Sequence, residues 1–409
     1  MTVDFELRPV TREELPAFTR TDLTAFGERG DQARFELDWT SLELDRTLAA
    51  FDGEEIVGTG RLFSFELTMP GGKLQPAAAV SWIAVLPTHR RRGILTAIKR
   101  CQLDDAVERG EPLAMLYASE GGIYRRFGYG IASSSMTVTV DTRHSAFLHP
   151  VPEGRVRLVE EDAARKLFPE IFDRARRIQP GAVQRVDEWW PDQFFWPEPD
   201  ERGTRFYCVY ESPEGRLDGY AAYRTEMRWD NGAHGTVHVR DLVTITPTAR
   251  AVLWRYLLDV DLTENVAAWV VPLDEPLRWL LAEPRRMRVG RLAESLWLRV
   301  LDAPAALEAR TYSAPGRVVF DVRDQFRPGG GAAGRFELEG GPDGAEARRT
   351  TAEPDLALDV AELGALLLGG VRASTLARAG LVHERTAGAL AVADAMFDVD
   401  PLPFSMTDF

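Results

Sequence analysis

The residues with the clearest chemical potential are those of the basic turn His89–Leu95, which reads HRRRGIL. The turn follows an apolar strand candidate and opens a helix candidate. Backbone N–H groups at a helix start, together with the helix dipole, bind anions, and three consecutive arginines add positive charge. Gly93 lets a ligand approach the backbone closely. The turn therefore suits the binding of a diphosphate. The same residues are equally compatible with a solvated basic turn that only caps a helix.

Other ligand-binding patterns are missing from the sequence. It has no GxxxxGK[ST] segment and no GxGxxG after a strand, which argues against a P-loop and a dinucleotide fold. The two cysteines, Cys101 and Cys208, are too few for a zinc site and are typical of small core residues. His234 and His238 are four residues apart, but their glycine-rich surroundings indicate a turn and a strand. We therefore expect no metal.

The elements that must position the basic turn alternate between strands and helices. Thr11 and Glu14 have capping-box spacing and predict a helix over 11–26. Pro87 ends a strand candidate, and apolar spacing predicts a helix over 94–108. Strands are predicted by alternation or apolar runs at residues 48–51, 56–67, 78–85 and 113–118. Strand, loop, helix and strand around one turn form an α/β pattern.

A second segment repeats this arrangement about 160 residues later. Residues 243–250 read VTITPTAR and match IAVLPTHR at 83–90, and an apolar helix candidate follows in both places. The matching order of elements indicates a duplicated unit. The second copy has Ala251-Val252-Leu253 where the first has Arg91-Arg92-Gly93. Because an apolar triplet should not hold a diphosphate, we predict that only the first copy binds one.

Composition narrows the classes of protein. The chain has 409 residues, enough for two to four domains, with 45% hydrophobic and 27% charged residues, as in globular proteins. Its net charge of -14 argues against a nucleic-acid partner and is compatible with a cationic substrate. The start, MTVDFELRPV, lacks signal-peptide character, and no apolar run has the roughly 18 residues of a membrane span. These features predict a cytoplasmic protein without a membrane partner.

The motif PTHRRRG at 87–93, combined with ASEGGIYRRFGYG at 118–130, resembles the enhanced intracellular survival (Eis) family of GCN5-related N-acetyltransferases. Residues 296–310 and 369–380 are similar to its third domain. Arg90 and Gly93 match the family's pyrophosphate loop, and Leu95 departs from the usual Gly or Ala. The resemblance implies an α/β (α+β) fold with tandem acetyltransferase-like domains and a sterol-carrier-protein-like α+β domain. These are a catalytic domain (1–150), a degenerate copy (151–295) and a third domain (296–409) whose C-terminus completes the active site.

The resemblance also implies roles for particular residues. Tyr124, in GGIY, would be the general acid that protonates the leaving CoA thiolate, whose thiol has a pKa near 8.5. A packing role for Tyr124 is the alternative, with Tyr117 and Tyr129 close by in sequence. The pantetheine arm would lie along the backbone of Ile83, Ala84 and Val85. The remaining cofactor contacts would come from Arg91, Arg92, Gly93, Ile94, Leu95, Thr96, Ser119 and Glu120.

The family's base is the C-terminal α-carboxylate, which here belongs to Phe409. A free terminus is usually frayed, but PLPFSMTDF contains prolines and phenylalanines that indicate a docked tail. Desolvation in a cleft raises the pKa of a carboxylate and suits it to accept a proton. Asp408 competes as base or as an anionic substrate contact. Trp82, Phe26 and Trp39 would line the acceptor cleft by analogy. The aromatic cluster Trp189–Trp196 indicates packing of the second region or an interaction surface.

The sequence thus predicts an acetyl-CoA-dependent N-acetyltransferase. The resemblance implies direct transfer in a ternary complex to primary amines of aminoglycoside-like or other cationic acceptors, at several positions, by a hexamer. One alternative is acetylation of a dedicated metabolite amine or a protein lysine. Another is a lipid- or small-molecule-binding protein with a vestigial transferase site.

Overall fold

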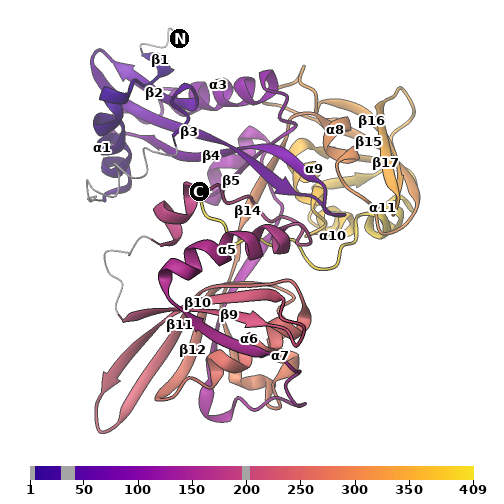
Figure 1. Cartoon of the computed structure of the whole chain (residues 1–409). Helices are drawn as coiled ribbons and strands as arrows, with labels where there is room; N and C mark the ends of the chain where they lie inside the picture. Colours follow the sequence, from indigo (N-terminus) through magenta and orange to yellow (C-terminus); the bar gives the residue numbers. More distant parts are fainter. Residues whose placement is uncertain (1–4, 29–41, 196–202) are drawn as a thin grey trace.

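The computed structural model describes residues 5–28, 42–195 and 203–409. Their strands form two seven-stranded sheets and one five-stranded sheet. Figure 1 shows the first sheet with its helices above the second sheet, and the third domain beside the first. The C-terminus lies between the first and second domains. The tandem architecture predicted from the duplicated segment is therefore present.

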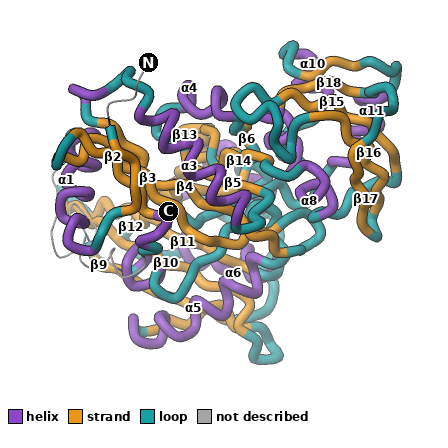
Figure 2. The backbone as a smooth tube through the Cα atoms, turned by 90° about the horizontal axis from the view of Figure 1, so that it is seen from above, coloured by secondary structure: helices purple, strands orange, loops and turns teal. Residues whose placement is uncertain are grey.

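The first sheet has the strand order β1-β2-β3-β4-β5-β14-β6. Helix α3 crosses over β3 and β4 (Figure 2), and α1 packs against the same two strands. Glycine makes the close approach of α3 possible, because a Cβ on Gly60 would lie 2.5 Å from Ile98 Cγ2. The bounds are β1 (Glu6–Pro9), α1 (Leu15–Phe26), β2 (Thr47–Asp52), β3 (Glu55–Thr68), β4 (Leu74–Val85), α3 (Ile94–Glu108), β5 (Leu113–Tyr117), α4 (Gly121–Tyr124), β6 (Gly130–Ile131) and β14 (Leu296–Val300).

The second sheet has the order β13-β7-β12-β11-β10-β9-β8 and repeats the key feature of the first. In both sheets a long strand pairs in parallel with its neighbour and then diverges. The last parallel pair falls at Ala79 in β4, eight residues before Pro87, and at Val239 in β11, eight residues before Pro247. The bounds are β7 (Ser134–Asp141), β8 (Arg155–Val159), α5 (Glu161–Arg176), β9 (Thr204–Glu211), β10 (Leu217–Trp229), β11 (Ala233–Thr244), α6 (Pro247–Leu258), β12 (Thr263–Pro272), α7 (Leu277–Leu280) and β13 (Met287–Glu294).

Two strands cross the boundaries predicted at 150 and 296. Strand β7, from the first region, pairs with β12 and β13 of the second sheet. Strand β14, from the start of the third region, inserts between β5 and β6 of the first sheet. The cores are consequently continuous: one apolar cluster joins Phe65 of β3, Leu298 of β14 and Leu363 of the third domain. The domains cannot be separated by cutting the chain at the predicted boundaries.

The third domain contains a five-stranded sheet in the order β17-β16-β15-β18-β19. Its helix α9 is buried along its whole length and packs on β14 and β6. Gly130 allows this contact, because a Cβ there would lie 1.7 Å from the Ala361 carbonyl oxygen. The bounds are α8 (Ala303–Glu308), β15 (Gly316–Arg323), β16 (Gly334–Gly341), β17 (Gly344–Arg349), β18 (Leu356–Asp359), α9 (Val360–Leu367), α10 (Ala373–Arg378), β19 (Val382–Glu384) and α11 (Ala389–Phe397).

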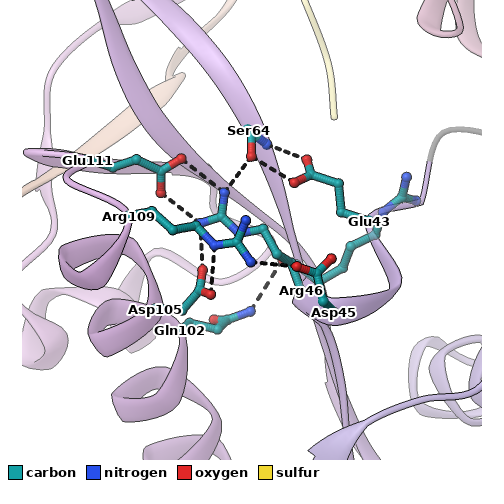
Figure 3. Close-up of polar contacts among 9 residues, drawn as sticks. Glu43, Asp45, Arg46, Ser64, Gln102, Asp105, Arg109 and Glu111 are labelled. Carbon is teal, nitrogen blue, oxygen red and sulfur yellow. Dashed lines mark hydrogen bonds and ion pairs between the residues drawn. The ribbon is translucent and has the colours of Figure 1, made fainter.

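A buried ion-pair network holds α3 on the first sheet (Figure 3). The Arg46 side chain, just before β2, is fully buried and lies 2.6 Å from a Glu111 carboxylate oxygen and 2.8 Å from one of Asp105. Arg46 also donates to Ser64 Oγ on β3 at 2.7 Å. Glu111 lies just before β5 and Asp105 lies near the end of α3. Because a buried charge is costly without partners, this network fixes the far end of the helix whose start carries the basic turn.

Candidate active site

A cavity of about 720 Å³ occupies the place where β4 and β5 diverge. It is bounded by the end of α1, the last residues of strand β4, the start of α3 and the segment after β5. Its lining consists of Ala25, Phe26, Ile83, Ala84, Val85, His89, Arg90, Arg91, Gly93, Ile94, Leu95, Thr96, Ser119, Glu120, Ile123, Tyr124 and Arg126. The structure therefore brings together most of the cofactor residues predicted from the sequence.

The basic turn has the backbone geometry of an anion-binding loop. Gly93 caps α3 with φ +88° and Arg91 has φ +65°, so both lie in the left-handed region. The space beside Gly93 is open, because a Cβ there would meet no described atom within 4 Å. The first N–H groups of α3, from Ile94 onward, face the same cavity as Arg91. These residues fit the diphosphate of CoA.

Arg92 departs from its predicted role. It is not among the cavity-lining residues, and its guanidinium donates to Asp52 Oδ2 at 3.0 Å. Asp52 also lies 3.2 Å from His89 Nε2. The left-handed residues on both sides of Arg92 turn consecutive side chains in different directions. Arg92 therefore fastens the turn to the hairpin between β2 and β3.

The strand beside the cavity is shaped by a β-bulge. Trp82 and Ile83 face Gly60 across the register shift between β3 and β4, and Trp82 has φ +50°. The Thr59 hydroxyl donates to the Trp82 carbonyl at 2.9 Å and fixes the bulge. Beyond Ala79, β4 pairs with β3 and no longer with β5. The edge of Ile83–Val85 is thereby available to hydrogen-bond an extended ligand such as pantetheine.

Tyr124 is the tyrosine that the structure places in the cavity wall. It ends α4, only 5% of its surface is exposed, and its ring meets that of Tyr129 edge-on at 6.0 Å. Tyr129 accepts a hydrogen bond from Lys99 Nζ at 2.9 Å, whereas Tyr117 packs its ring against Phe409 at 5.0 Å. Burial, with a smaller contribution from Glu120, raises the pKa of Tyr124 to about 12. Its hydroxyl is therefore neutral near pH 7 and can donate a proton.

The predicted acceptor-side residues have different fates. Phe26 lines the cavity from the end of α1. Trp82 does not; its ring stacks on Phe18 at 6.0 Å and supports the bulge instead. Trp39 lies outside the described residues. Asp22, four residues before Phe26 on α1, is a half-buried carboxylate that is not among the lining residues, and the Thr59 hydroxyl donates to its Oδ1 at 3.5 Å. Burial raises the pKa of Asp22 to about 6. The helical spacing of Asp22 and Phe26 was the sequence signal that could have identified it.

The tail is docked, as its composition predicted. The Phe409 ring contacts Tyr117 at 5.0 Å and Phe65 at 5.9 Å, at the end of β5 that leads into Ser119 and Glu120. Phe409 itself is not among the cavity-lining residues. Asp408 is fixed through its carbonyl, which accepts a hydrogen bond from Trp189 Nε1 at 2.7 Å. The terminus therefore lies next to the end of β5, from which the chain runs on into α4 and Tyr124.

Comparisons with known proteins agree with this geometry. Residues 6–132 and 181–300 each match a family model described as an acetyltransferase (GNAT) domain. Residues 303–406 match a sterol carrier protein domain. N-acetyltransferase Eis of Mycobacterium tuberculosis is 36% identical over 356 residues, which cover 85% of this chain and 84% of that protein. The chain belongs to the Eis family of N-acetyltransferases.

Other relatives cover more of the chain. An uncharacterised N-acetyltransferase of Streptomyces coelicolor is 40% identical over 98% of both chains. Eis1 from Mycobacterium abscessus superposes with a TM-score of 0.87 at 36% identity, covering 99% of this chain and 100% of its own. The chain is thus an N-acetyltransferase with two GNAT domains, a fold that uses an acyl-CoA donor. Among the described residues, we find no cluster of three metal-ligating side chains and no helix long and apolar enough to cross a membrane.

The different orientations of Arg91 and Arg92 give a direct test of the cofactor site. Arg91→Ala is expected to raise the dissociation constant of CoA roughly 10- to 100-fold, because hydrogen bonds to charged groups contribute about 1.5–3 kcal/mol. Arg92→Ala removes a neighbouring charge that pairs with Asp52 and should change the constant less than about threefold, as expected for a surface ion pair. Titration calorimetry with CoA measures both. Equal losses in the two variants would contradict this placement of the diphosphate.

Proposed function

We propose that this chain transfers the acetyl group of acetyl-CoA to primary amines of cationic small molecules of the aminoglycoside or polyamine type. The observation that carries the proposal is one cavity that combines an anion-binding turn, a free strand edge and the buried neutral hydroxyl of Tyr124. Phe26 on its wall supplies an apolar surface for the acceptor. Net negative charge favours the approach of a cation.

The position of the thiols supports direct transfer in a ternary complex. Neither Cys101 nor Cys208 is among the cavity-lining residues, and burial raises the pKa of each thiol. The protein therefore places no activated thiolate beside the acetyl group. The acceptor nitrogen attacks the acetyl carbonyl carbon, the C–S bond breaks, and the Tyr124 hydroxyl donates its proton to the departing sulfur.

The amine must also lose a proton, and we assign its acceptance to the α-carboxylate of Phe409. The docked ring of Phe409 beside Tyr117 supports this assignment, because it brings the terminus to the strand end next to the cavity. The carboxylate receives the proton from nitrogen while Tyr124 supplies one to sulfur. The two transfers balance, and exchange with solvent resets both groups. Asp408, the neighbouring carboxylate, contacts the cationic acceptor in this scheme.

An amine panel tests the proposed substrate class. Purified protein is mixed with acetyl-CoA, a thiol indicator and one of several amines: an aminoglycoside, a linear polyamine, a small monoamine or a lysine-containing peptide. We expect CoA release with the first two, and mass spectrometry should show more than one acetyl group on each. Release with the peptide or monoamine alone would favour a protein-lysine or dedicated-metabolite enzyme.

We further propose that the chain forms a hexamer and acts in the cytoplasm. Three tryptophans of the second domain support assembly, because Trp229, Trp269 and Trp279 are 71%, 70% and 78% exposed. Side chains of this size are uncommon on a free surface and typical of protein interfaces. Light scattering coupled to size-exclusion chromatography should give six chains per particle. A monomer at micromolar concentration would contradict the assembly.

A further inference from the structure

The opening between β11 and β12 in the second domain is the counterpart of the cofactor cavity in the first. Val243 and Thr244 precede Pro247 by four and three residues, just as Ile83 and Ala84 precede Pro87. The two pairs therefore hold equivalent positions. A cavity of about 190 Å³ lies there, with Leu242, Val243 and Thr244 in its wall. An apolar triplet replaces Arg91, Arg92 and Gly93 in this copy. The remaining arginine, Arg250 at the position of Arg90, lines the cavity but forms an ion pair with the buried Glu275. The groove therefore lacks the basic turn that fits a diphosphate in the first domain.

The groove is occupied by the C-terminal tail of the same chain. Phe404, Ser405 and Met406 form part of the cavity wall, opposite the strand residues. Met406 packs on the apolar cluster that contains Val243 and Phe172. The tail therefore lies where a GNAT domain holds its cofactor.

Backbone and side-chain hydrogen bonds fix the tail along residues 179–183. The Gln179 side-chain amide donates to the Leu402 carbonyl at 2.8 Å, and the Phe404 amide donates to the Pro180 carbonyl at 2.8 Å. The Thr407 hydroxyl donates to the Val183 carbonyl at 2.9 Å. Gly181 allows this approach, because a Cβ there would lie 3.1 Å from the Phe404 nitrogen. The tail is thus held along the segment 179–183 in the way that a peptide ligand binds through its main chain.

Arg185 joins the tail to the core of the second domain. Its guanidinium side chain is 2% exposed; it donates to Asp241 Oδ2 at 2.6 Å and to the Tyr220 hydroxyl at 3.0 Å. The same guanidinium donates to the Met406 carbonyl at 3.2 Å and to Thr407 Oγ1 at 3.3 Å. One buried group therefore orders two consecutive tail residues only a few positions before the terminus.

The aromatic cluster found in the sequence surrounds this arginine. Its charge centre lies over the rings of Phe172, Trp189 and Trp190 at 4.1, 4.4 and 5.1 Å. Trp189 also donates to the Asp408 carbonyl at 2.7 Å. A guanidinium enclosed by rings and paired with a buried carboxylate has little freedom to move. The cluster thus acts as a rigid anchor for residues 406–408.

We infer that the second domain has exchanged its cofactor for the chain's own C-terminus. Its former cofactor groove is a peptide receptor for residues 401–409, and Arg185 is a positioning residue that places the Phe409 carboxylate beside the catalytic cavity. The contacts described above support the binding of the tail in the groove. The effect of Arg185 on catalysis rests in addition on the proposed role of Phe409 as base.

The full-length Arg185→Met variant tests the inference through hydrogen exchange. We expect amide exchange of residues 402–409 to rise at least 10-fold, while α3 and β4 exchange at the wild-type rate. The kcat should fall at least 10-fold with an unchanged dissociation constant for CoA. Arg185→Lys, which keeps the charge, should restore part of both. The matched control is Arg174→Met, which removes an arginine of the same domain that donates to Asp218 Oδ1 at 2.6 Å and to the Leu217 carbonyl at 2.9 Å, neither of which belongs to the tail.

The possible results distinguish a failure of the receptor inference from a failure of the proposed base. Unchanged tail exchange in Arg185→Met, compared with Arg174→Met, would overturn the receptor whatever the activity. A freed tail with normal kcat would overturn the positioning role of Arg185 and count against Phe409 as the base, and it would leave the receptor standing. If Arg185→Met does not fold, Thr407→Val removes the hydroxyl contacts to Val183 and Arg185 without leaving a buried charge, and the same expectations apply.

A second experiment asks whether the groove recognises the tail as a separate peptide. A protease site placed at the exposed residues Asp398 and Asp400 allows the folded full chain to be cut before the tail. We expect the released segment to stay bound and to exchange with a labelled PLPFSMTDF peptide, as seen by fluorescence anisotropy. A C-terminally amidated peptide should bind equally and support little turnover. Loss of the segment on cutting, with no uptake of the peptide, would overturn the receptor.

Discussion

A Tyr124→Phe variant is expected to lose about 100- to 10,000-fold in kcat, the range that a positioned general acid contributes. The substitution removes one hydroxyl from a ring whose packing against Tyr129 remains. The dissociation constant of CoA should stay within about twofold, because the basic turn and the β4 edge are untouched. Since burial raises the pKa of Tyr124 to about 12, the wild-type hydroxyl stays protonated below that pH. Steady-state kinetics with CoA titration measures both quantities.

Tyr129→Phe is the matched control for Tyr124. Tyr129 is fully buried and accepts a hydrogen bond from Lys99 Nζ at 2.9 Å, so its loss leaves a buried ammonium or amine with fewer partners. We expect a less stable protein with nearly normal kcat, since removing one partner of a buried polar pair costs about 1–3 kcal/mol of folding free energy. A full loss of turnover in Tyr129→Phe together with normal turnover in Tyr124→Phe would reassign the acid.

The cofactor half of the site was predictable because it depends on local sequence. Helix α3 begins at Ile94 and ends at Glu108, as apolar spacing predicted, and the Thr11–Glu14 capping box is present. Gly93 has the left-handed backbone angle that a glycine in a turn signals, and Arg91, two residues earlier, has one as well. The outward direction of Arg92 was not predictable, because it depends on a partner, Asp52, that lies forty residues away in the sequence.

The acceptor half was harder to predict because it is assembled from distant segments. Trp82 is an aromatic residue beside the cofactor strand, but a β-bulge turns it onto Phe18. Asp22 acquires its raised pKa from burial against residues that sequence spacing does not reveal. The pairing of β7 with the second sheet and of β14 with the first sheet likewise depends on contacts between strands that are distant in the sequence. Amphipathic periodicity predicts a strand and its faces but does not identify its neighbours.

The tail illustrates the same limit for function. The apolar triplet at 251–253 predicts a groove without diphosphate chemistry, but the sequence pattern gives no sign of what replaces the cofactor. Only the contacts of Arg185 with Met406 and Thr407 reveal the occupant. The aromatic residues around Trp189 predicted packing of the second region or an interaction surface, and in the structure they pack around Arg185 and hold the tail. In the proposal above, a degenerate domain contributes to the active site of its neighbour through nine residues at the opposite end of the chain.

Adding a single glycine after Phe409 is expected to lower kcat about 100- to 10,000-fold, the contribution of a general base. One residue moves the carboxylate by about 3.5 Å and puts a neutral amide in its place. The Phe409 ring can keep its contacts with Tyr117 and Phe65, so CoA binding and thermal stability should not change. Stopped-flow kinetics with a saturating cationic amine, alongside CoA titration and thermal unfolding, separates these effects.

Two further variants decide whether the α-carboxylate or its neighbour acts as the base. Phe409→Leu keeps the carboxylate and shortens the apolar anchor, so it should retain most of the kcat that the glycine extension loses. Asp408→Asn removes the competing carboxylate while its carbonyl still accepts the Trp189 hydrogen bond; we expect weaker acceptor binding with little change in kcat. Normal turnover in the extended chain, combined with loss of turnover in Asp408→Asn, would transfer the role of base to Asp408. The docked tail would then position a side chain rather than a terminus, through the same contacts with Arg185 and Trp189.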